Sequence, residues 1–251
     1  MNSDVVICLP ARYQSSRLPG KPLIEIAGKP LIIWALESAA KIKAKQMVVA
    51  TDDQRIQKMV ESKGYHAIMT SDMHQSGTDR IAEVAQKLSW SDDTIVVNYQ
   101  GDEPLIPKAN IQQLISALED NKAASIATLY QSIDNYQDLI NPNNVKLVCD
   151  NKSYALYFSR AAIPYSREAF SAHKLDHLID YKHHIGIYAY RASFLKSFSQ
   201  LPSSELERTE SLEQLRAMSY GYRIIAKKAG QIMPHGIDTQ ADIERFERSL
   251  L

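Results

Sequence analysis

Three cationic side chains lie close together near the start of the chain. The segment 10–21 has the sequence P-A-R-Y-Q-S-S-R-L-P-G-K, and its cations are Arg12, Arg17 and Lys21. An arginine guanidinium presents a planar fork that suits phosphate oxygens, and a lysine ammonium presents a compact charge. The segment is not a Walker A loop, because Ser15 and Pro22 stand where that motif needs glycine and Ser or Thr. It therefore predicts a phosphate site built from side chains, with a solvated basic turn as the alternative.

Two aspartates that lie far apart in the sequence are candidate metal ligands. Asp102 lies in the segment N-Y-Q-G-D-E-P at 98–104, where Gly101 permits a close approach of the backbone. Asp238 lies in G-I-D-T at 236–239, directly before a segment with helical spacing. Mg²⁺ takes one or two carboxylates together with substrate phosphates. We expect a magnesium site at Asp102 and Asp238, although a turn and a helix N-cap would use the same residues.

A third polar segment, Q-S-G-T-D-R at 75–80, precedes an apolar stripe with helical spacing. Arg80 and the free N–H groups at the start of that helix could bind the base or the phosphates of a nucleotide. The alternative is a plain helix cap provided by Thr78 or Asp79.

The elements that must position these segments alternate along the first 120 residues. Short apolar runs predict strands over Val5–Leu9, Met47–Ala50, Ala67–Thr70 and Thr94–Tyr99. Amphipathic spacing predicts helices that begin at Pro30, after a cap at Asp52, near Ile81 and behind Pro107. This alternation predicts an α/β fold with a mostly parallel, Rossmann-like sheet flanked by helices. Ligands bind at the carboxyl ends of such strands, so we expect the site in loops 10–22, 50–53, 71–80 and 100–107.

The second half of the chain has a different pattern. It predicts an antiparallel pair over Val145–Cys149 and Tyr154–Ser159, a strand over His184–Arg191, a helix over Leu206–Tyr220, a strand over Arg223–Lys227 and a closing helix over Ala241–Leu250. We interpret the chain as one domain over 1–251, with a smaller mixed α/β lobe at about 130–220, because no linker-like stretch bounds that region. The irregular segment Ser166–Asp180 is expected to be the most mobile loop.

Bulk composition excludes several classes of protein. The 251 residues contain 29 Lys plus Arg and 29 Asp plus Glu, which disfavours a nucleic-acid binder with a basic surface. No apolar stretch approaches the ~18 residues of a membrane span, and no secretory signal opens the chain. Cys8 and Cys149 have neither metal-site nor redox spacing, which favours a reducing, cytoplasmic location.

In combination, the motifs resemble those of the 3-deoxy-manno-octulosonate cytidylyltransferases, the CMP-Kdo synthetases. The resemblance is carried by P-A-R-x-x-S-S-R-L-P-G-K-P-L at 10–23, A-T-D-D at 50–53, Q-S-G-T-D-R at 75–80, N-Y-Q-G-D-E-P at 98–104, A-L-Y-F-S-R at 155–160, H-I-G-I-Y-A-Y-R at 184–191, L-E-Q-L-R at 212–216 and G-I-D-T at 236–239. It runs in order from about residue 5 to residue 248. The first loop alone is shared with the sialic acid cytidylyltransferases, whereas the combination is much more specific.

The resemblance implies a role for each matching residue. Lys21, Asp102 and Asp238 would be catalytic, and the two aspartates would bind Mg²⁺. CTP would be bound by Ala11, Arg12, Arg17, Lys21, Ser76 and Arg80, and the sugar by Gln100, Arg160, His184, Tyr188 and Glu213. Without the resemblance, Arg160 fits a surface salt bridge, His184 a core histidine and Glu213 a solvated helix position. The family further implies a homodimer formed through the smaller lobe.

The implied reaction is the transfer of CMP from CTP to 3-deoxy-manno-octulosonate (Kdo), which gives CMP-Kdo and pyrophosphate and activates the sugar for lipopolysaccharide synthesis. A related acid sugar, 8-amino-Kdo or sialic acid, is the main alternative. His183 stands where the family often has Arg, which leaves room for a different sugar pocket. A glycosyltransferase is less compatible, because neither Asp52-Asp53 nor Asp102-Glu103 has the Asp-x-Asp spacing of its metal motif. A nucleotide-binding regulator without catalytic activity is a third alternative.

Overall fold

The computed structural model describes residues 4–14, 18–74, 76–176, 179–234 and 236–250. Its strands are β1 (Val5–Ala11), β2 (Glu25–Ile26), β3 (Lys29–Pro30), β4 (Gln46–Thr51), β5 (His66–Met69), β6 (Ile95–Asn98), β7 (Ile126–Ser132), β8 (Lys146–Cys149), β9 (Ala155–Ser159), β10 (Lys182–Arg191) and β11 (Ile224–Lys228). Its helices are the 3₁₀ turn η1 (Lys21–Leu23), α1 (Leu31–Ala39), α2 (Gln54–Ser62), α3 (Gly77–Lys87), α4 (Lys108–Asp120), α5 (Tyr136–Ile140), α6 (Arg167–Ser171), α7 (Ala192–Phe198), α8 (Glu205–Glu210), α9 (Gln214–Ser219) and α10 (Gln240–Ser249).

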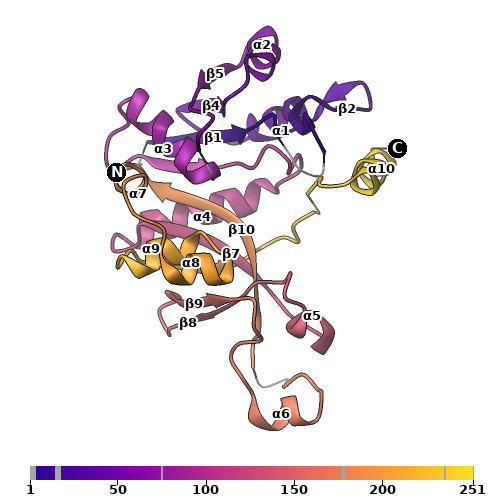
Figure 1. The fold of residues 1–251 in the computed structure, drawn as a ribbon, viewed down its shortest axis with the longest axis vertical. Coiled ribbons are helices and arrows are strands. Elements are labelled where there is room, and N and C mark those ends of the chain that lie inside the picture. The colour runs from indigo at the N-terminus through magenta and orange to yellow at the C-terminus, as the bar shows by residue number, and fades with distance from the viewer. Residues whose placement is uncertain (1–3, 15–17, 75, 177–178, 235, 251) are drawn as a thin grey trace.

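A twisted central sheet organises these elements (Figure 1). Its strand order is β11-β7-β10-β6-β1-β4-β5, and β8 pairs with β10 and β9 beside this path. The pairs β1–β4, β1–β6, β4–β5 and β7–β11 are parallel. Within the described residues of this path, β10 alone runs antiparallel to its neighbours. The predicted α/β fold with a mostly parallel sheet flanked by helices is confirmed.

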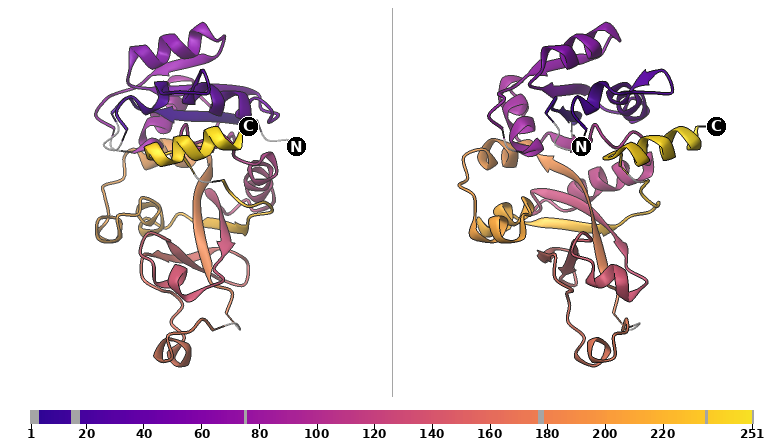
Figure 2. Two further views of the ribbon diagram at one scale, coloured as in Figure 1. Left: turned by 90° about the vertical axis from the view of Figure 1, so that its right-hand side faces the viewer. Right: turned by 45° about the vertical axis from the view of Figure 1, so that its right-hand side comes forward.

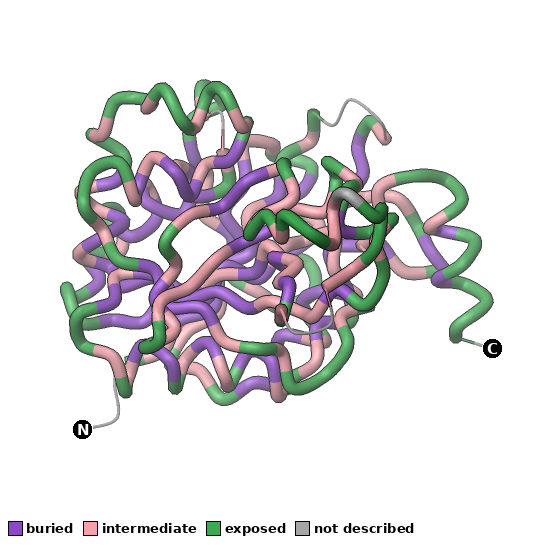
Figure 3. The backbone as a smooth tube through the Cα atoms, turned by 90° about the horizontal axis from the view of Figure 1, so that it is seen from below, coloured by how far each residue is buried: buried purple, intermediate pink, exposed green. Residues whose placement is uncertain are grey.

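Helices cover both faces of the sheet. Consecutive residues of a strand point to opposite faces, so each strand supplies side chains to both cores. Ile7 and Leu9 of β1 join the core beneath α1, α2 and α4, whereas Val6 and Cys8 join the core beneath α3, α7 and α9. The strands β1, β4 and β6 are buried on both faces, which explains why they are nearly continuous apolar runs. In Figure 3 the buried positions are concentrated in the main body of the molecule.

The C-terminal helix α10 packs against the segment that follows the first loop (Figure 2). Ile243 and Phe246 are buried with Leu31 of α1, and the Phe246 ring meets Trp34 edge-on with centroids 5.6 Å apart. Thr239 caps the helix in a capping box with Asp242. This docking holds Asp238, which directly precedes the cap, close to the amino-terminal part of the chain.

The smaller lobe projects from one end of the molecule in Figure 1, where β8, β9, α5 and α6 lie together. The predicted antiparallel pair is confirmed as β8 and β9, joined by a turn in which Asp150 N–H donates to the Tyr154 carbonyl. The long strand β10 pairs with β6 in the main sheet and with β8 in the lobe, so the two parts share one sheet.

Three local predictions were wrong or incomplete. The expected helix over Leu206–Tyr220 is two short helices, because Ser211 takes a left-handed conformation (φ 53°) between α8 and α9. The cap of α2 is Asp53 and not Asp52, since the Asp53 carboxylate accepts from Arg55 N–H. Neither β7 nor α7 was predicted. The segment 166–180 contains the helix α6, and its mobility stays a prediction. Among the described residues, no helix is long and apolar enough to cross a membrane.

Candidate active site

A cavity of about 450 Å³ opens at the carboxyl ends of β1 and β6. Its lining comes from the first loop and η1, the start of α3, the loop after β6, β10, the turn before α9 and the segment before α10. The lining residues are Pro10, Ala11, Arg12, Lys21, Pro22, His74, Ser76, Gly77, Thr78, Arg80, Asn98, Gln100, Gly101, Asp102, Tyr188, Tyr190, Glu213 and Asp238. Three of the four loops chosen from the strand-end rule therefore contribute, and the loop 50–53 does not line the cavity directly.

Lys21 forms ion pairs with two carboxylates that line this cavity. Its Nζ donates to Asp102 Oδ2 at 2.7 Å and to Asp238 Oδ1 at 2.8 Å. The Lys21 side chain is 10% exposed, whereas the side chains of Asp102 and Asp238 are 35% and 43% exposed. The two aspartates thus keep oxygen surface open to the cavity while a buried cation fixes their positions. Residues separated by up to 217 positions meet here, as the predicted magnesium site requires.

A third carboxyl, Glu103, lies beside this cluster. Burial and then the negative charges of Asp102 and Asp238 raise the pKa of Glu103 to about 8, although Lys21 opposes the shift. These effects favour the protonated form of Glu103. One lysine beside two aspartates gives a formal net negative charge, which suits a further cation.

The backbone packs closely where the first loop passes the loop after β6. A Cβ atom at position 101 would lie 3.3 Å from the Pro10 carbonyl oxygen and 3.3 Å from Ile32 Cδ1. This tight contact is the close approach predicted for Gly101, and it sets Asp102 next to the end of β1.

Most of the residues expected to bind CTP line the cavity. Ala11, Arg12, Ser76 and Arg80 line it, and Arg12 is exposed. Ser76 is the N-cap of α3, where its hydroxyl accepts from Asp79 N–H, so the suggested cap at Thr78 or Asp79 is wrong. Arg17 lies outside the described residues.

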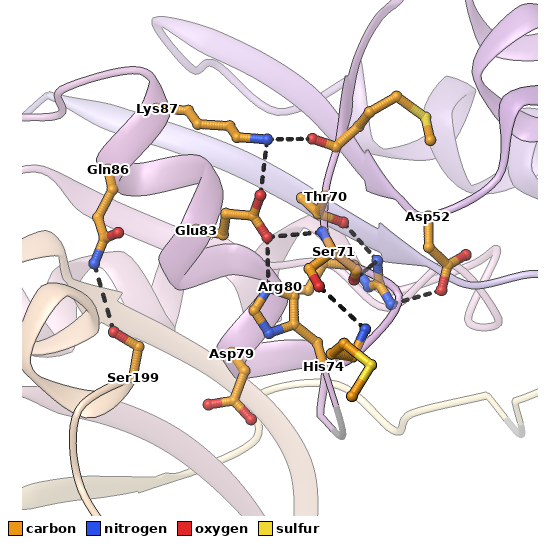
Figure 4. A network of polar contacts seen from close by, with 12 residues as sticks. Asp52, Thr70, Ser71, His74, Asp79, Arg80, Glu83, Gln86, Lys87 and Ser199 are labelled. Atoms are coloured by element: carbon orange, nitrogen blue, oxygen red, sulfur yellow. Dashed lines mark hydrogen bonds and ion pairs between the residues drawn. The ribbon is translucent and has the colours of Figure 1, made fainter.

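The Arg80 guanidinium is only 3% exposed and is bound by the protein (Figure 4). Its Nη2 donates to Asp52 Oδ2 at 2.7 Å, and its Nη1 donates to the Thr70 hydroxyl and to the Ser71 carbonyl. Arg80 thus holds the ends of β4 and β5 against α3 in addition to lining the cavity.

Gln100, Tyr188 and Glu213, three of the residues expected to bind the sugar, also line the cavity. Gln100 Nε2 donates to the Gly186 carbonyl at 2.7 Å, which orients the amide. Glu213 precedes α9, and its carboxylate accepts a hydrogen bond from Thr78 Oγ1. Burial raises the pKa of Glu213, although hydrogen bonds from Ser76 and Thr78 partly counteract that shift.

Two expected sugar-binding residues do not line the cavity. His184 is 7% exposed and pairs with Thr128 Oγ1 at 2.9 Å, while burial lowers the pKa of His184 to about 3. Its ring lies 5.3 Å from that of Tyr188, which does line the cavity. Arg160 donates to the backbone carbonyls of Pro142, Glu210 and Ser211. His184 thus has the environment of the core histidine that was its alternative, whereas Arg160 binds backbone carbonyls and forms no surface salt bridge in the described structure. The contact of both residues with a sugar stays a prediction.

Four polar lining residues were not predicted from the sequence: His74, Thr78, Asn98 and Tyr190. Tyr190 follows Tyr188 by two positions on β10, so strand periodicity places both rings on the same face, where they stack at 5.8 Å. Tyr190 OH lies 3.1 Å from Thr78 Oγ1, which links β10 to the start of α3. The i, i+2 spacing was a signal that could have identified Tyr190.

The fold and the cavity define an α/β protein with a polar, charged site at the strand ends, and comparison with known proteins assigns the class. The model of a family described as "Cytidylyltransferase" matches residues 6–225. The chain is also similar to the solved structure of a CMP:2-keto-3-deoxy-manno-octonic acid synthetase complexed with CTP. That likeness has a TM-score of 0.89 and 42% identity, and it covers 99% of this chain and 98% of the other.

Similarity to curated relatives shows which group of cytidylyltransferases the chain resembles. A 3-deoxy-manno-octulosonate cytidylyltransferase of Pseudomonas fluorescens is 50% identical over 100% of this chain and 99% of its own length. One of Nitrosococcus oceani is 48% identical over 98% of this chain and 96% of its own length. The chain therefore belongs to the cytidylyltransferase family, among the 3-deoxy-manno-octulosonate cytidylyltransferases, which confirms the resemblance seen in its motifs.

Proposed function

We propose that this protein transfers CMP from CTP to Kdo, releases pyrophosphate, and thereby activates the sugar for lipopolysaccharide synthesis. The observation that carries the proposal is the cluster in which Lys21 joins Asp102 and Asp238 at the strand-end cavity. The cluster combines a fixed cation with two partly open carboxylates, the arrangement that a triphosphate and its counter-ion require. Full-length similarity to Kdo cytidylyltransferases supports the choice of substrates.

The protein's own contribution is positioning and neutralisation of charge. Arg12 and Lys21 bind the triphosphate together with Arg17, while Ser76 and Arg80 bind CTP from the start of α3. The anomeric hydroxyl of Kdo then attacks the α-phosphorus, and the bond from that phosphorus to the pyrophosphate oxygen breaks on the opposite side. The hydroxyl proton passes to solvent. Fixed cations stabilise the charge that builds up on the departing pyrophosphate.

The donor set fits magnesium. Asp102 and Asp238 present hard carboxylate oxygens, and the described residues contain no group of three or more His, Cys, Asp or Glu that could enclose a metal. Mg²⁺ suits such a site, because it commonly keeps one or two carboxylates and takes its other ligands from substrate phosphates and water. When bound, the ion neutralises triphosphate charge and acidifies the attacking hydroxyl.

Three polar residues of the lining hold the sugar. Gln100, Tyr188 and Glu213 offer an amide, a phenol and a carboxyl for the hydroxyl groups of the sugar. We retain Arg160 and His184 as further sugar contacts, and both would need to gain access to the cavity when the sugar binds. A related acid sugar remains the alternative substrate.

We also propose a cytoplasmic homodimer. Ile140, Leu156 and Tyr165 on the smaller lobe are 42%, 59% and 66% exposed, which supports a partner surface there. Cys8 and Cys149 are both free thiols, which supports a reducing compartment.

The test is release of pyrophosphate by the purified protein with Mg²⁺. Each of the four nucleoside triphosphates would be paired with Kdo, 8-amino-Kdo and sialic acid in a coupled assay. We expect release only with CTP, and fastest with Kdo. Equal or faster turnover with another acid sugar would assign the alternative substrate, and no release with any pair would contradict the proposal.

A further inference from the structure

The loop 50–53 contributes no residue to the cavity lining. One of its side chains nevertheless contacts both the first loop and α3. Asp52 Oδ2 accepts from Arg80 Nη2 at 2.7 Å, and Asp52 Oδ1 accepts from the Tyr13 backbone N–H at 3.3 Å. The Asp52 side chain is 14% exposed. One nearly buried carboxylate thus connects the end of β1 with α3 from its place after β4.

The Arg80 end of this connection is rigid. The guanidinium is 3% exposed and also donates to the Thr70 hydroxyl and the Ser71 carbonyl, so its plane is fixed from two directions (Figure 4). Arginine presents its donors in a fixed fork, and a fixed guanidinium therefore fixes the carboxylate that faces it. Asp52 consequently offers its second oxygen to Tyr13 from a defined position.

The Tyr13 end is the base of the first loop. Gly20 N–H donates to the Tyr13 carbonyl at 3.0 Å, which brings the two ends of the loop together. Gly20 has φ +69°, and a Cβ atom there would lie 3.1 Å from the Tyr13 ring, so glycine is needed at this contact. The Arg55 guanidinium covers the same ring at 3.5 Å.

The two proposed phosphate-binding cations are sequence neighbours of Tyr13 and Gly20. Arg12 directly precedes Tyr13, and Lys21 directly follows Gly20. The Tyr13 N–H belongs to the planar peptide unit that joins Arg12 to Tyr13. A hydrogen bond to that N–H therefore sets the direction in which the backbone leaves Arg12, and through the Gly20 contact it also sets the start of η1 at Lys21.

We propose that Asp52 is a positioning residue for the triphosphate site. Its carboxylate is held in place by Arg80 and in turn binds the Tyr13 N–H at the start of the first loop. This contact holds Arg12 and Lys21 at the spacing that CTP requires. The inference rests on the proposed function, because it assigns these two cations to the triphosphate. Asp52 does not line the cavity, so its loss acts through Arg12 and Lys21 and leaves Gln100, Tyr188 and Glu213 in place.

The sharpest test is Asp52→Asn. Aspartate supplies two acceptor oxygens, whereas asparagine supplies one oxygen and one donor group, so in either orientation the amide loses one of the two contacts. We expect KM for CTP, and Kd for CTP measured by calorimetry without sugar, to rise about tenfold, which corresponds to about 1.4 kcal/mol. KM for Kdo should change less than about twofold, because the hydrogen bonds of Asp52 in the described structure are with Tyr13 and Arg80 and not with Gln100, Tyr188 or Glu213. Asp52→Glu, which restores both oxygens, should recover part of the affinity for CTP.

Asp92→Asn is the control. The Asp92 side chain is 72% exposed and pairs with Lys196, and it contacts neither Tyr13, Arg55 nor Arg80 in the described structure. This variant should keep wild-type KM values for both substrates. If the wild type releases pyrophosphate and the Asp52→Asn variant has the wild-type affinity for CTP, Asp52 has no positioning role. If Asp52→Asn only lowers the melting temperature, its role is structural. Failure of the wild type to use CTP would instead contradict the proposed function.

Discussion

Two ion-pair clusters at the same edge of the sheet differ in how much of their charge remains available. In the first, Lys21 lies between Asp102 and Asp238, whose side chains are 35% and 43% exposed. In the second, Arg80 and Asp52 are 3% and 14% exposed, and hydrogen bonds within the protein occupy both oxygens of the carboxylate and both terminal nitrogens of the guanidinium. The comparison teaches that exposure, rather than the presence of charge, separates groups that can exchange partners with a ligand from groups that hold the site together.

The largest expected effect tests the buried cluster through stability. Arg80→Met should lower the free energy of unfolding by about 3 kcal/mol, because it leaves the Asp52 carboxylate nearly buried without its charged partner. Urea unfolding followed by circular dichroism would measure the change. The control is Arg55→Met, whose side chain is 59% exposed and pairs with Asp53. We expect that control to change stability much less, because an exposed ion pair contributes little. Equal effects of the two substitutions would remove the distinction between the clusters.

The next effect tests the open cluster through catalysis. Asp102→Asn should lower turnover at saturating Mg²⁺ by about 10²-fold, the range seen when one group that stabilises developing charge is removed. Stability should change little, since Asp102 already faces the cavity. Release of pyrophosphate would be compared with Asp92→Asn, in which the altered side chain is 72% exposed and pairs with Lys196. Near-normal turnover of the Asp102→Asn variant would exclude a role for Asp102 in binding a catalytic metal.

A smaller effect sharpens the assignment of Lys21. Lys21→Ala should raise KM for CTP about tenfold, as expected when a hydrogen-bonded charge is lost, and should change KM for Kdo less than about twofold. Steady-state kinetics with each substrate varied in turn would measure both constants. Lys45→Ala is the control, because Lys45 is 66% exposed and pairs only with Asp4 at the surface in the described structure. Unchanged kinetics with CTP would remove Lys21 from the triphosphate site.

The sequence predicted the framework better than the details of the second half. Apolar runs and helical stripes located β1, β4, β5 and β6 and the helices between them, because these local patterns reflect burial on both faces of a parallel sheet. The break between α8 and α9 was missed, because no local pattern shows that Ser211 takes a left-handed conformation. The choice between the adjacent acids at positions 52 and 53 was equally undetermined, since either side chain can cap a helix.

By itself, the sequence determined which side chains follow each strand, and the strand-end rule then indicated where they would gather. It also determined the family, since motifs in order along the chain carry that information. Only the tertiary structure decided which partners meet: Lys21 with a carboxylate 217 positions away, and Asp52 with both Arg80 and the Tyr13 backbone. The physical reason is that strand order and helix docking are set by packing over the whole chain, and a carboxylate's role depends on the neighbours that this packing supplies.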